Sequence, residues 1–191
     1  MDAGLAAVLG ALAGSVATIG AALATGWSAR AQAKMVARAE HLRQRRDARQ
    51  AVYEEFIAAA EAHSDLAKIL LAPTPEDLND LERLHILPQG MNFFGVIEES
   101  KSLHENVAKI STRVQLAGPK EVSAAAFIVD EKSREVRASF GTMHMSADAL
   151  GGRSLSERWS DGCMRFVRFS GAVSDFTEKA RLALDDDGTK N

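Results

Sequence analysis

Residues that form covalent cross-links or rigid turns are scarce in this sequence. The one cysteine, Cys163, excludes an intramolecular disulfide framework and a cysteine-rich zinc site. It lies between Gly162 and Met164 near an apolar helix face, where we expect a small buried hydrophobe rather than a nucleophile. Only four prolines occur, and no segment alternates between apolar and polar residues as a half-buried strand does. These absences predict an all-α protein.

Charge is missing from Leu5 to Trp27, and the chain turns basic soon afterwards, from Arg30. As a helix this 23-residue segment would be about 35 Å long, enough to cross the hydrocarbon core of a bilayer. We therefore expect residues 1–27 to form an N-terminal transmembrane anchor, with Trp27 at the membrane interface. Small residues recur every four positions along it, and we expect them to let a second helix pack closely: Gly10, Gly14, Thr18, Ala22 and Gly26.

Two other interpretations of this segment stay open. A signal peptide could end at Ala22-Leu-Ala24, although such peptides carry positive charge before their apolar core, and this chain has only Asp2 there. A soluble alanine-rich helix would need a wider core around it than the rest of the chain offers. The pattern does not decide whether residues 1–27 are retained or cleaved.

Residues 28–50 are strongly basic, with seven cationic and two acidic side chains and a net charge of +5. By the positive-inside rule, this stretch places the N-terminus outside the cell and the C-terminal domain in the cytoplasm, which predicts a cell-membrane location. The stretch has neither proline nor glycine, so we expect a juxtamembrane helical stalk. Its cations are expected to contact anionic lipid headgroups: Arg30, Lys34, Arg38, Arg43, Arg45, Arg46 and Arg49.

Residues 51–191 carry a net charge of −7. This argues against nucleic acid as the main ligand, because phosphate binding needs clustered lysine and arginine. The first helix of this part, up to Leu71, has apolar residues at near-heptad spacing. We call these positions the first seam: Val52, Phe56, Ala59, His63, Leu66 and Leu70.

Three more long helices are predicted after the first seam. They run from about Phe93 to Ala117, from about 119 to 149, and from the capping box Ser154-Leu-Ser-Glu157 to Leu184. A short helix up to about Leu87 is expected in the connection before the first of them, and 185–191 is expected to be a disordered tail. The four long helices predict an antiparallel four-helix bundle over residues 51–184.

Side chains that carry chemistry are scattered along the sequence. A di-iron bundle needs two Glu-x-x-His pairs, and only Glu82-Arg-Leu-His85 occurs, in the connection between helices. His63 falls on the first seam, where a hydrogen-bonded core residue is the simpler interpretation. No partner can be assigned to His104 or His144 from the sequence. We therefore predict no catalytic residue, no metal ligand and no cofactor.

The order of these parts is accompanied by three short motifs. They are Thr25-Gly26-Trp27, Arg49-Gln-Ala-Val-Tyr53-Glu-Glu-Phe56 and Leu116-Ala-Gly118-Pro119-Lys-Glu-Val122. With them the chain resembles small uncharacterised membrane-anchored all-helical proteins of high-GC Gram-positive bacteria. The resemblance covers most of the chain and implies a membrane-anchored helical fold, but it implies no activity and no site residue.

Three classes of function fit these observations. The favoured one is a single-pass, non-enzymatic membrane protein whose cytoplasmic bundle is an interaction or scaffolding module. It would pair with a helical protein or a second copy, in coiled-coil fashion, through the first seam and the stalk. The second class is a helical enzyme that holds Mg²⁺ or a nucleotide with carboxylates such as Glu54, Glu55, Glu98 and Glu99. The third is a holin-like or toxin protein that oligomerises in the membrane.

Overall fold

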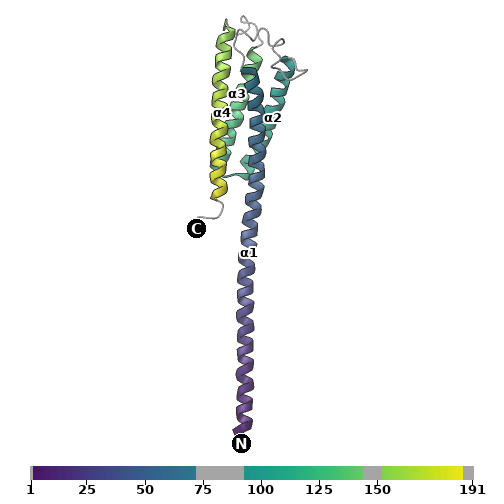
Figure 1. The fold of residues 1–191 in the computed structure, drawn as a ribbon, viewed down its shortest axis with the longest axis vertical. Coiled ribbons are helices and arrows are strands. Elements are labelled where there is room, and N and C mark those ends of the chain that lie inside the picture. The colour runs from purple at the N-terminus through teal and green to yellow at the C-terminus, as the bar shows by residue number, and fades with distance from the viewer. Residues whose placement is uncertain (1, 72–92, 144–151, 187–191) are drawn as a thin grey trace. The chain divides into compact units, whose positions relative to one another are not determined.

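The structure is a computed structural model that describes residues 2–71, 93–143 and 152–186; of residues 2, 3, 5–24 and 93 it describes the helical backbone alone. The described residues form four α-helices (Figure 1): α1 (Asp2–Leu71), α2 (Phe93–Ala117), α3 (Lys120–Met143) and α4 (Leu155–Asp185). The all-α prediction is confirmed. The chain divides into two compact units between Arg45 and Arg46, so α1 contributes to both.

The first unit is the N-terminal part of α1. All its described side chains from 25 to 45 are exposed. Among the side chains that the structure describes, which leave out 5–24, no helix is long and apolar enough to cross a membrane. Gly10, Gly14, Thr18 and Ala22, which we expected to pack against a second helix, lie outside the described side chains. The fifth, Gly26, is exposed, and a Cβ atom there would meet nothing within 4 Å.

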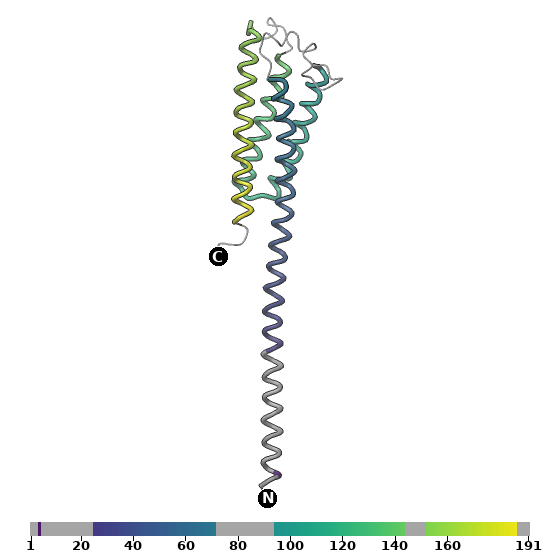
Figure 2. Tube along the Cα trace, in the orientation of Figure 1, coloured from purple at the N-terminus to yellow at the C-terminus, as the bar shows by residue number. Residues whose placement is uncertain are grey.

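The second unit is a helical bundle in which neighbouring helices run in opposite directions (Figure 2). Phe56, early in the bundle portion of α1, contacts Phe176 near the end of α4, with ring centroids 4.6 Å apart. At a similar level of α1, Glu55 pairs with Arg113 near the end of α2. Helix α3 packs against both α2 and α4. The described helices thus have the arrangement that the four amphipathic patterns predict.

Local sequence signals set the ends of the helices. At the corner between α2 and α3, a Cβ atom on Gly118 would lie 2.9 Å from the Tyr53 hydroxyl and 3.0 Å from the Val114 carbonyl, so a larger residue would require the tyrosine ring to shift. At the start of α4, the Ser154 hydroxyl accepts from the amide of Glu157, whose carboxylate accepts in turn from the Ser154 amide. The predicted capping box is therefore present.

The core follows the heptad-like seams of the helices. Five of the six first-seam residues are buried and Val52 is half-buried, so this seam is filled within the chain and is not exposed to a partner. In α3 the buried residues include Val122, Ala126, Val129, Ser133, Val136, Phe140 and Met143, which keep the alternating spacing of four and three. Phe94, near the start of α2, is exposed, whereas Val96, Ser100 and His104 of the same helix are buried.

The bundle begins about one turn before the predicted boundary at residue 51. The guanidinium of Arg46 lies 4.0 Å from the Asp185 carboxylate, and Arg49 Nε donates to the Ala117 carbonyl at 3.0 Å. Two of the seven side chains expected to contact lipid headgroups therefore touch the bundle. The predicted short helix before Leu87, the end of the third predicted helix after Met143, and residues 187–191 of the predicted tail lie outside the described residues.

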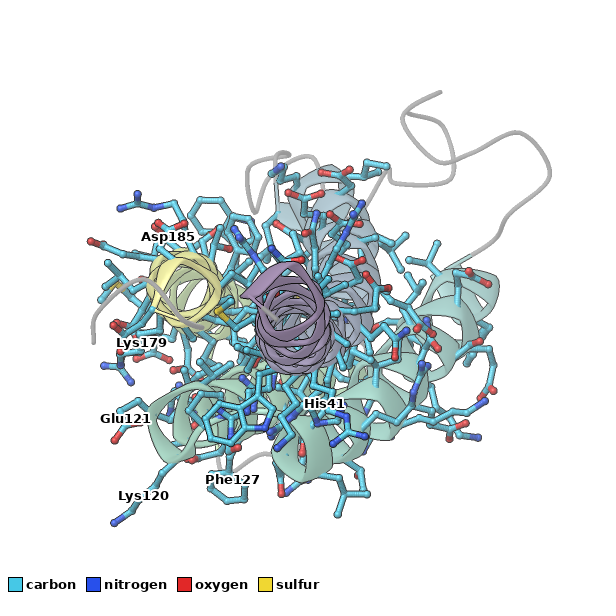
Figure 3. The ribbon with its side chains drawn as sticks, turned by 90° about the horizontal axis from the view of Figure 1, so that it is seen from below. His41, Lys120, Glu121, Phe127, Lys179 and Asp185 are labelled. Carbon is cyan, nitrogen blue, oxygen red and sulfur yellow. The ribbon has the colours of Figure 1, made fainter. Side chains whose placement is uncertain are left out.

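Replacing Phe176 with alanine should lower the free energy of unfolding by about 3–5 kcal/mol, because the ring is fully buried between Tyr53 and Phe56. The measurement is urea unfolding of the full chain followed by circular dichroism. Phe127→Ala is the matched control: this ring is 56% exposed and points outward from α3 (Figure 3), so the expected change is within about 0.5 kcal/mol. Equal losses in the two variants would contradict this description of the core.

Candidate functional site

Polar side chains converge inside the bundle at the level of His63. We call them the buried histidine cluster: His63 from α1, Ser100 and His104 from α2, and Ser133 from α3. His63, Ser100 and Ser133 have no exposed surface, and His104 is 7% exposed. Because polar groups are costly to bury, four of them joined at one level of a largely apolar core are the feature that most needs a physical explanation.

Helix periodicity brings these four residues together. His63 occupies a position of the first seam, and Ser133 stands between Val129 and Val136 at the corresponding positions of α3. Ser100 and His104 are four residues apart on α2 and so lie on one face of that helix. Each of the three helices thus has polar residues at inward-facing positions that are usually apolar.

Hydrogen bonds join the cluster into one chain. The Ser133 hydroxyl lies 2.8 Å from Nδ1 of His63 and 3.1 Å from Nδ1 of His104. The Ser100 hydroxyl lies 3.0 Å from Nε2 of His63. Both ring nitrogens of His63 therefore have partners, which offsets the cost of removing the imidazole from water. On the α4 side, the ring of Phe169 packs against that of His63 at a centroid distance of 5.6 Å.

Charged side chains of α3 border the cluster on the His104 side. Asp130 Oδ2 accepts from Arg134 at 3.3 Å. Asp130 Oδ1 is buried without a hydrogen bond among the described residues and lies 3.9 Å from Nδ1 of His104. That separation is too long for a hydrogen bond. Arg137, one turn after Ser133, is a second cation close enough to act on both histidines.

Both histidines are held in the neutral form by their surroundings. Burial lowers the pKa of His63 to about 4, and the charges of His104 and Arg137 act in the same direction. Burial also lowers the pKa of His104; Asp130 opposes this shift most strongly, while Arg137 and Arg134 add to it and Glu105 opposes it weakly. His104 therefore has an acidic neighbour that His63 lacks.

The closure of the cluster limits its chemistry. The Ser133 hydroxyl is within hydrogen-bond distance of His63, as a catalytic nucleophile is of its base. Neither side chain is exposed, so a substrate could not reach them. Within the described ranges, no three histidine, cysteine, aspartate or glutamate side chains are grouped to hold a metal ion. Cys163 is half-buried, and burial raises the pKa of its thiol, which disfavours the reactive thiolate.

Three of the four carboxylates proposed for a magnesium or nucleotide site are engaged separately. Glu55 binds Arg113 through both oxygens at 2.6 Å, and Glu54 accepts from Gln50 at 2.8 Å. Glu98 lies 3.6 Å from Lys101. These contacts pair the carboxylates with cations or amides on the outside of the bundle, and they leave this function class without a convergent site in the described residues.

Two open grooves lie on the bundle surface. The larger, of about 560 Å³, runs between α1 and α4 and is lined mainly by hydroxyl and charged groups: Glu61, Ser64, Lys68, Ser170, Val173, Ser174, Thr177, Glu178 and Arg181. The smaller, of about 360 Å³, lies between the start of α3 and the end of α4 and includes Glu121 and Lys179, which Figure 3 shows at the same end of the bundle. Both are open to solvent and mix charges of both signs.

The sequence predicted part of the cluster. His63 was expected to be a hydrogen-bonded core residue, and this is confirmed. Ser100, Ser133 and the role of His104 were missed. A signal for Ser133 was present, because it occupies a heptad position between two buried valines. Its partners could not be assigned, because the rotation of α2 against α3 is not encoded in either helix alone.

Comparison with known proteins adds no assignment: the chain matches no protein-family model, no curated protein and no solved structure.

The bundle should lose stability as the pH falls below about 6.5. Because the pKa of His63 is lower in the folded state than its ordinary value of 6.5, the unfolded chain binds the extra proton more readily. The loss of stability begins near pH 6.5 and is complete near pH 4. From these two values we expect the free energy of unfolding to be about 2 kcal/mol lower at pH 5 than at pH 7.5.

Urea unfolding of the full chain at the two pH values measures this difference. His63→Gln should flatten the dependence, because an amide keeps hydrogen-bonding groups but does not titrate in this range. His41→Gln is the matched control, since His41 is exposed in the first unit, and it should behave as wild type. A wild-type stability that is the same at both pH values would contradict the assignment of a neutral buried His63.

Proposed function

We propose that this chain is a single-pass membrane protein of the cell membrane, with its N-terminus outside, and that its cytoplasmic helical bundle is a non-enzymatic interaction module. The observation that carries the proposal is the charge-free segment from Leu5 to Trp27, followed directly by the basic stretch of residues 28–50. The segment is long enough to span a bilayer, and the charge asymmetry of its flanks sets the orientation.

Helix α1 contributes to both the proposed anchor and the bundle. The helix continues from Asp2 to Leu71 without a proline, so the charge-free segment, the basic stretch and the first helix of the bundle belong to one element. A membrane segment in this helix would tether the bundle to the membrane. The exposed cations Arg30, Lys34 and Arg38 would lie next to the headgroups.

The closure of the buried histidine cluster supports a binding role over catalysis. Its histidines and serines converge at distances suited to proton transfer, yet they are covered by the helices themselves. Because the first seam is also filled, a partner would bind on the outer faces of the bundle or along the stalk. Large exposed apolar residues are available there: Phe94, Leu116, Phe127, Ile128, Met164, Val167 and Leu182 on the bundle, and Trp27, Met35, Val36 and Leu42 before it.

Alkaline carbonate extraction of membranes from cells that express the full chain tests the anchor. We expect wild type to stay in the pellet, because a spanning segment resists extraction. Leu12→Arg combined with Val16→Arg should move the chain to the soluble fraction, since each charge at the centre of a span costs about 2.5–3.5 kcal/mol. Val36→Arg, at an exposed position of the first unit, is the matched control and should remain in the pellet.

Cross-linking of the tagged full chain in mild detergent, with mass spectrometry, tests the module. A stoichiometric second protein cross-linked to the outer faces of the bundle would support the proposal. Recovery of the chain alone and monomeric would contradict it. Cross-links between two copies would indicate self-association, and Gly14→Leu should then abolish them while Ala13→Leu, on another side of the helix, should not.

A further inference from the structure

The spacing of the first seam continues along α1 into the first unit. From Val52 to Leu70 the positions of the first seam alternate between steps of four and three residues. The same alternation, carried back through Arg49, meets five residues of the first unit, which we call the stalk seam: Ala31, Met35, Arg38, Leu42 and Arg45. Because α1 is helical over this range, the five residues lie along one face of it.

The stalk seam is exposed, although it has the spacing of a seam that is buried elsewhere in the same helix. All five of its side chains are exposed, Met35 at 62% and Leu42 at 46%. In the bundle, other helices of the chain cover the first seam. Most of the stability of a helix in a protein comes from the packing of such a face. The heptad spacing and the exposed apolar residues therefore favour cover by a further helix.

Charge is distributed unequally around this part of α1. Arg38 and Arg45 belong to the stalk seam, and Lys34 lies one residue before Met35 at its border. Residues 28–50 contain two acidic side chains, Glu40 and Asp47. Each follows an arginine of the stalk seam by two positions, which places it on the other side of the helix. The face of the stalk seam thus carries cations and no carboxylate, and a complementary surface must be acidic.

A second copy of the chain does not meet this requirement. Two parallel stalk seams would place Arg38 against Arg38 and Arg45 against Arg45, and like charges at facing core positions are destabilising. Two antiparallel stalk seams would place the arginines against apolar residues of the other copy. Neither arrangement supplies a carboxylate, because Glu40 and Asp47 lie on the far side of each helix. Two stretches that each carry a net charge of +5 also repel each other.

A lipid surface does not match the stalk seam either. An amphipathic helix that lies in a membrane surface inserts a continuous apolar face and keeps its cations on the opposite, polar face. Here Arg38 stands between Met35 and Leu42 on the same line, so inserting the two apolar side chains would draw its guanidinium toward the hydrocarbon. Lipid headgroups can attract the cations of this stretch without covering its apolar residues.

We propose that the stalk seam is the docking site for an acidic amphipathic helix of another protein. The two helices pair as a short coiled coil, in which apolar side chains of the partner pack on Met35 and Leu42. Carboxylates of the partner bind Arg38 and Arg45, because a guanidinium holds a carboxylate through two parallel hydrogen bonds. The contact covers about two heptads, and its charge pairing makes the affinity fall as salt rises. This inference rests on the proposed interaction role and is independent of the proposed membrane anchor.

Binding of a synthetic acidic peptide to the full chain in mild detergent tests the apolar contact. The probe is a fluorescent helical peptide with leucine at its seam positions and glutamate beside them, and fluorescence anisotropy at low salt follows its binding. Leu42→Gln should weaken binding about tenfold or more, because a buried leucine contact is lost. Val36→Gln is the matched control, since Val36 is exposed on another side of α1, and it should bind as wild type. Equal affinities of the two variants, or no binding to wild type, would overturn the proposal.

Charge reversal tests the electrostatic match separately from net charge. Arg38→Glu combined with Arg45→Glu should abolish binding of the acidic peptide and create binding of a peptide in which lysine replaces each glutamate. Arg30→Glu combined with Arg43→Glu changes the net charge equally, at positions next to the stalk seam in sequence but on other sides of the helix. It should keep the preference for the acidic peptide. The same preference in both double variants would show attraction by net charge alone and would exclude docking at the stalk seam.

Photo-cross-linking in the native cells identifies the natural occupant. A photoreactive amino acid in place of Leu42 should form cross-links to an acidic, heptad-patterned segment of another protein, and the same group in place of Val36 should not. Cross-links from Leu42 to phospholipid or to a second copy would overturn the inference. A protein captured only by the same group in place of Phe127, on the outer face of the bundle, would overturn it and leave the proposed interaction role intact. Capture of no protein at any position would contradict both.

Discussion

A histidine can lie at the centre of an apolar core only when both of its ring nitrogens have partners. In this bundle the requirement is met for His63 by Ser133 of α3 and Ser100 of α2, so three helices must be aligned to within a hydrogen-bond length at one level. A shift of any of them by one turn would leave buried donors or acceptors unpaired, at a cost of about 1–3 kcal/mol for each group. The buried histidine cluster thus fixes the register of the helices, which their apolar seams alone specify less strictly.

Apolar contacts on either side of this level supply the bulk of the stability. Toward the α2–α3 corner, Tyr53 and Phe56 pack against Phe176, and Gly118 allows the chain to turn close to the tyrosine ring. Toward the other end, Gly162 of α4 is closely covered by Met143 and Leu71. Apolar packing is tolerant of small shifts, whereas hydrogen bonds are not. The two kinds of contact therefore have separate roles. The apolar contacts supply most of the free energy of unfolding, and the buried histidine cluster aligns the helices.

The same cluster makes the bundle sensitive to acid, because its alignment depends on imidazoles that are neutral. Protonation of His63 would place a charge on a side chain that has no exposed surface, so the expected loss of stability in acid follows from the same burial that aligns the helices. The proposed membrane anchor rests instead on the charge pattern of residues 1–50.

The sequence by itself determined the all-α class, the bounds of α2, the capped start of α4 and the buried face of α1 along the first seam. These follow from helix periodicity and from local signals such as Gly118-Pro119 and the capping box, which act within a few residues along the chain. It also identified His63 as a core residue that needs partners. Only the tertiary structure decided which partners these are, because Ser100, His104 and Ser133 come from two other helices.

The tertiary structure also decided that the first seam is covered by its own chain, and that Phe94 is exposed while Ser100 is buried. A heptad pattern states that one face of a helix is buried, but not which helix covers it or how the helix is rotated about its axis. Rotation and partner choice are set by the joint packing of four surfaces. The charge-free segment and the basic stretch, by contrast, were evident in the sequence alone, because hydrophobicity and charge require no partner to be recognised.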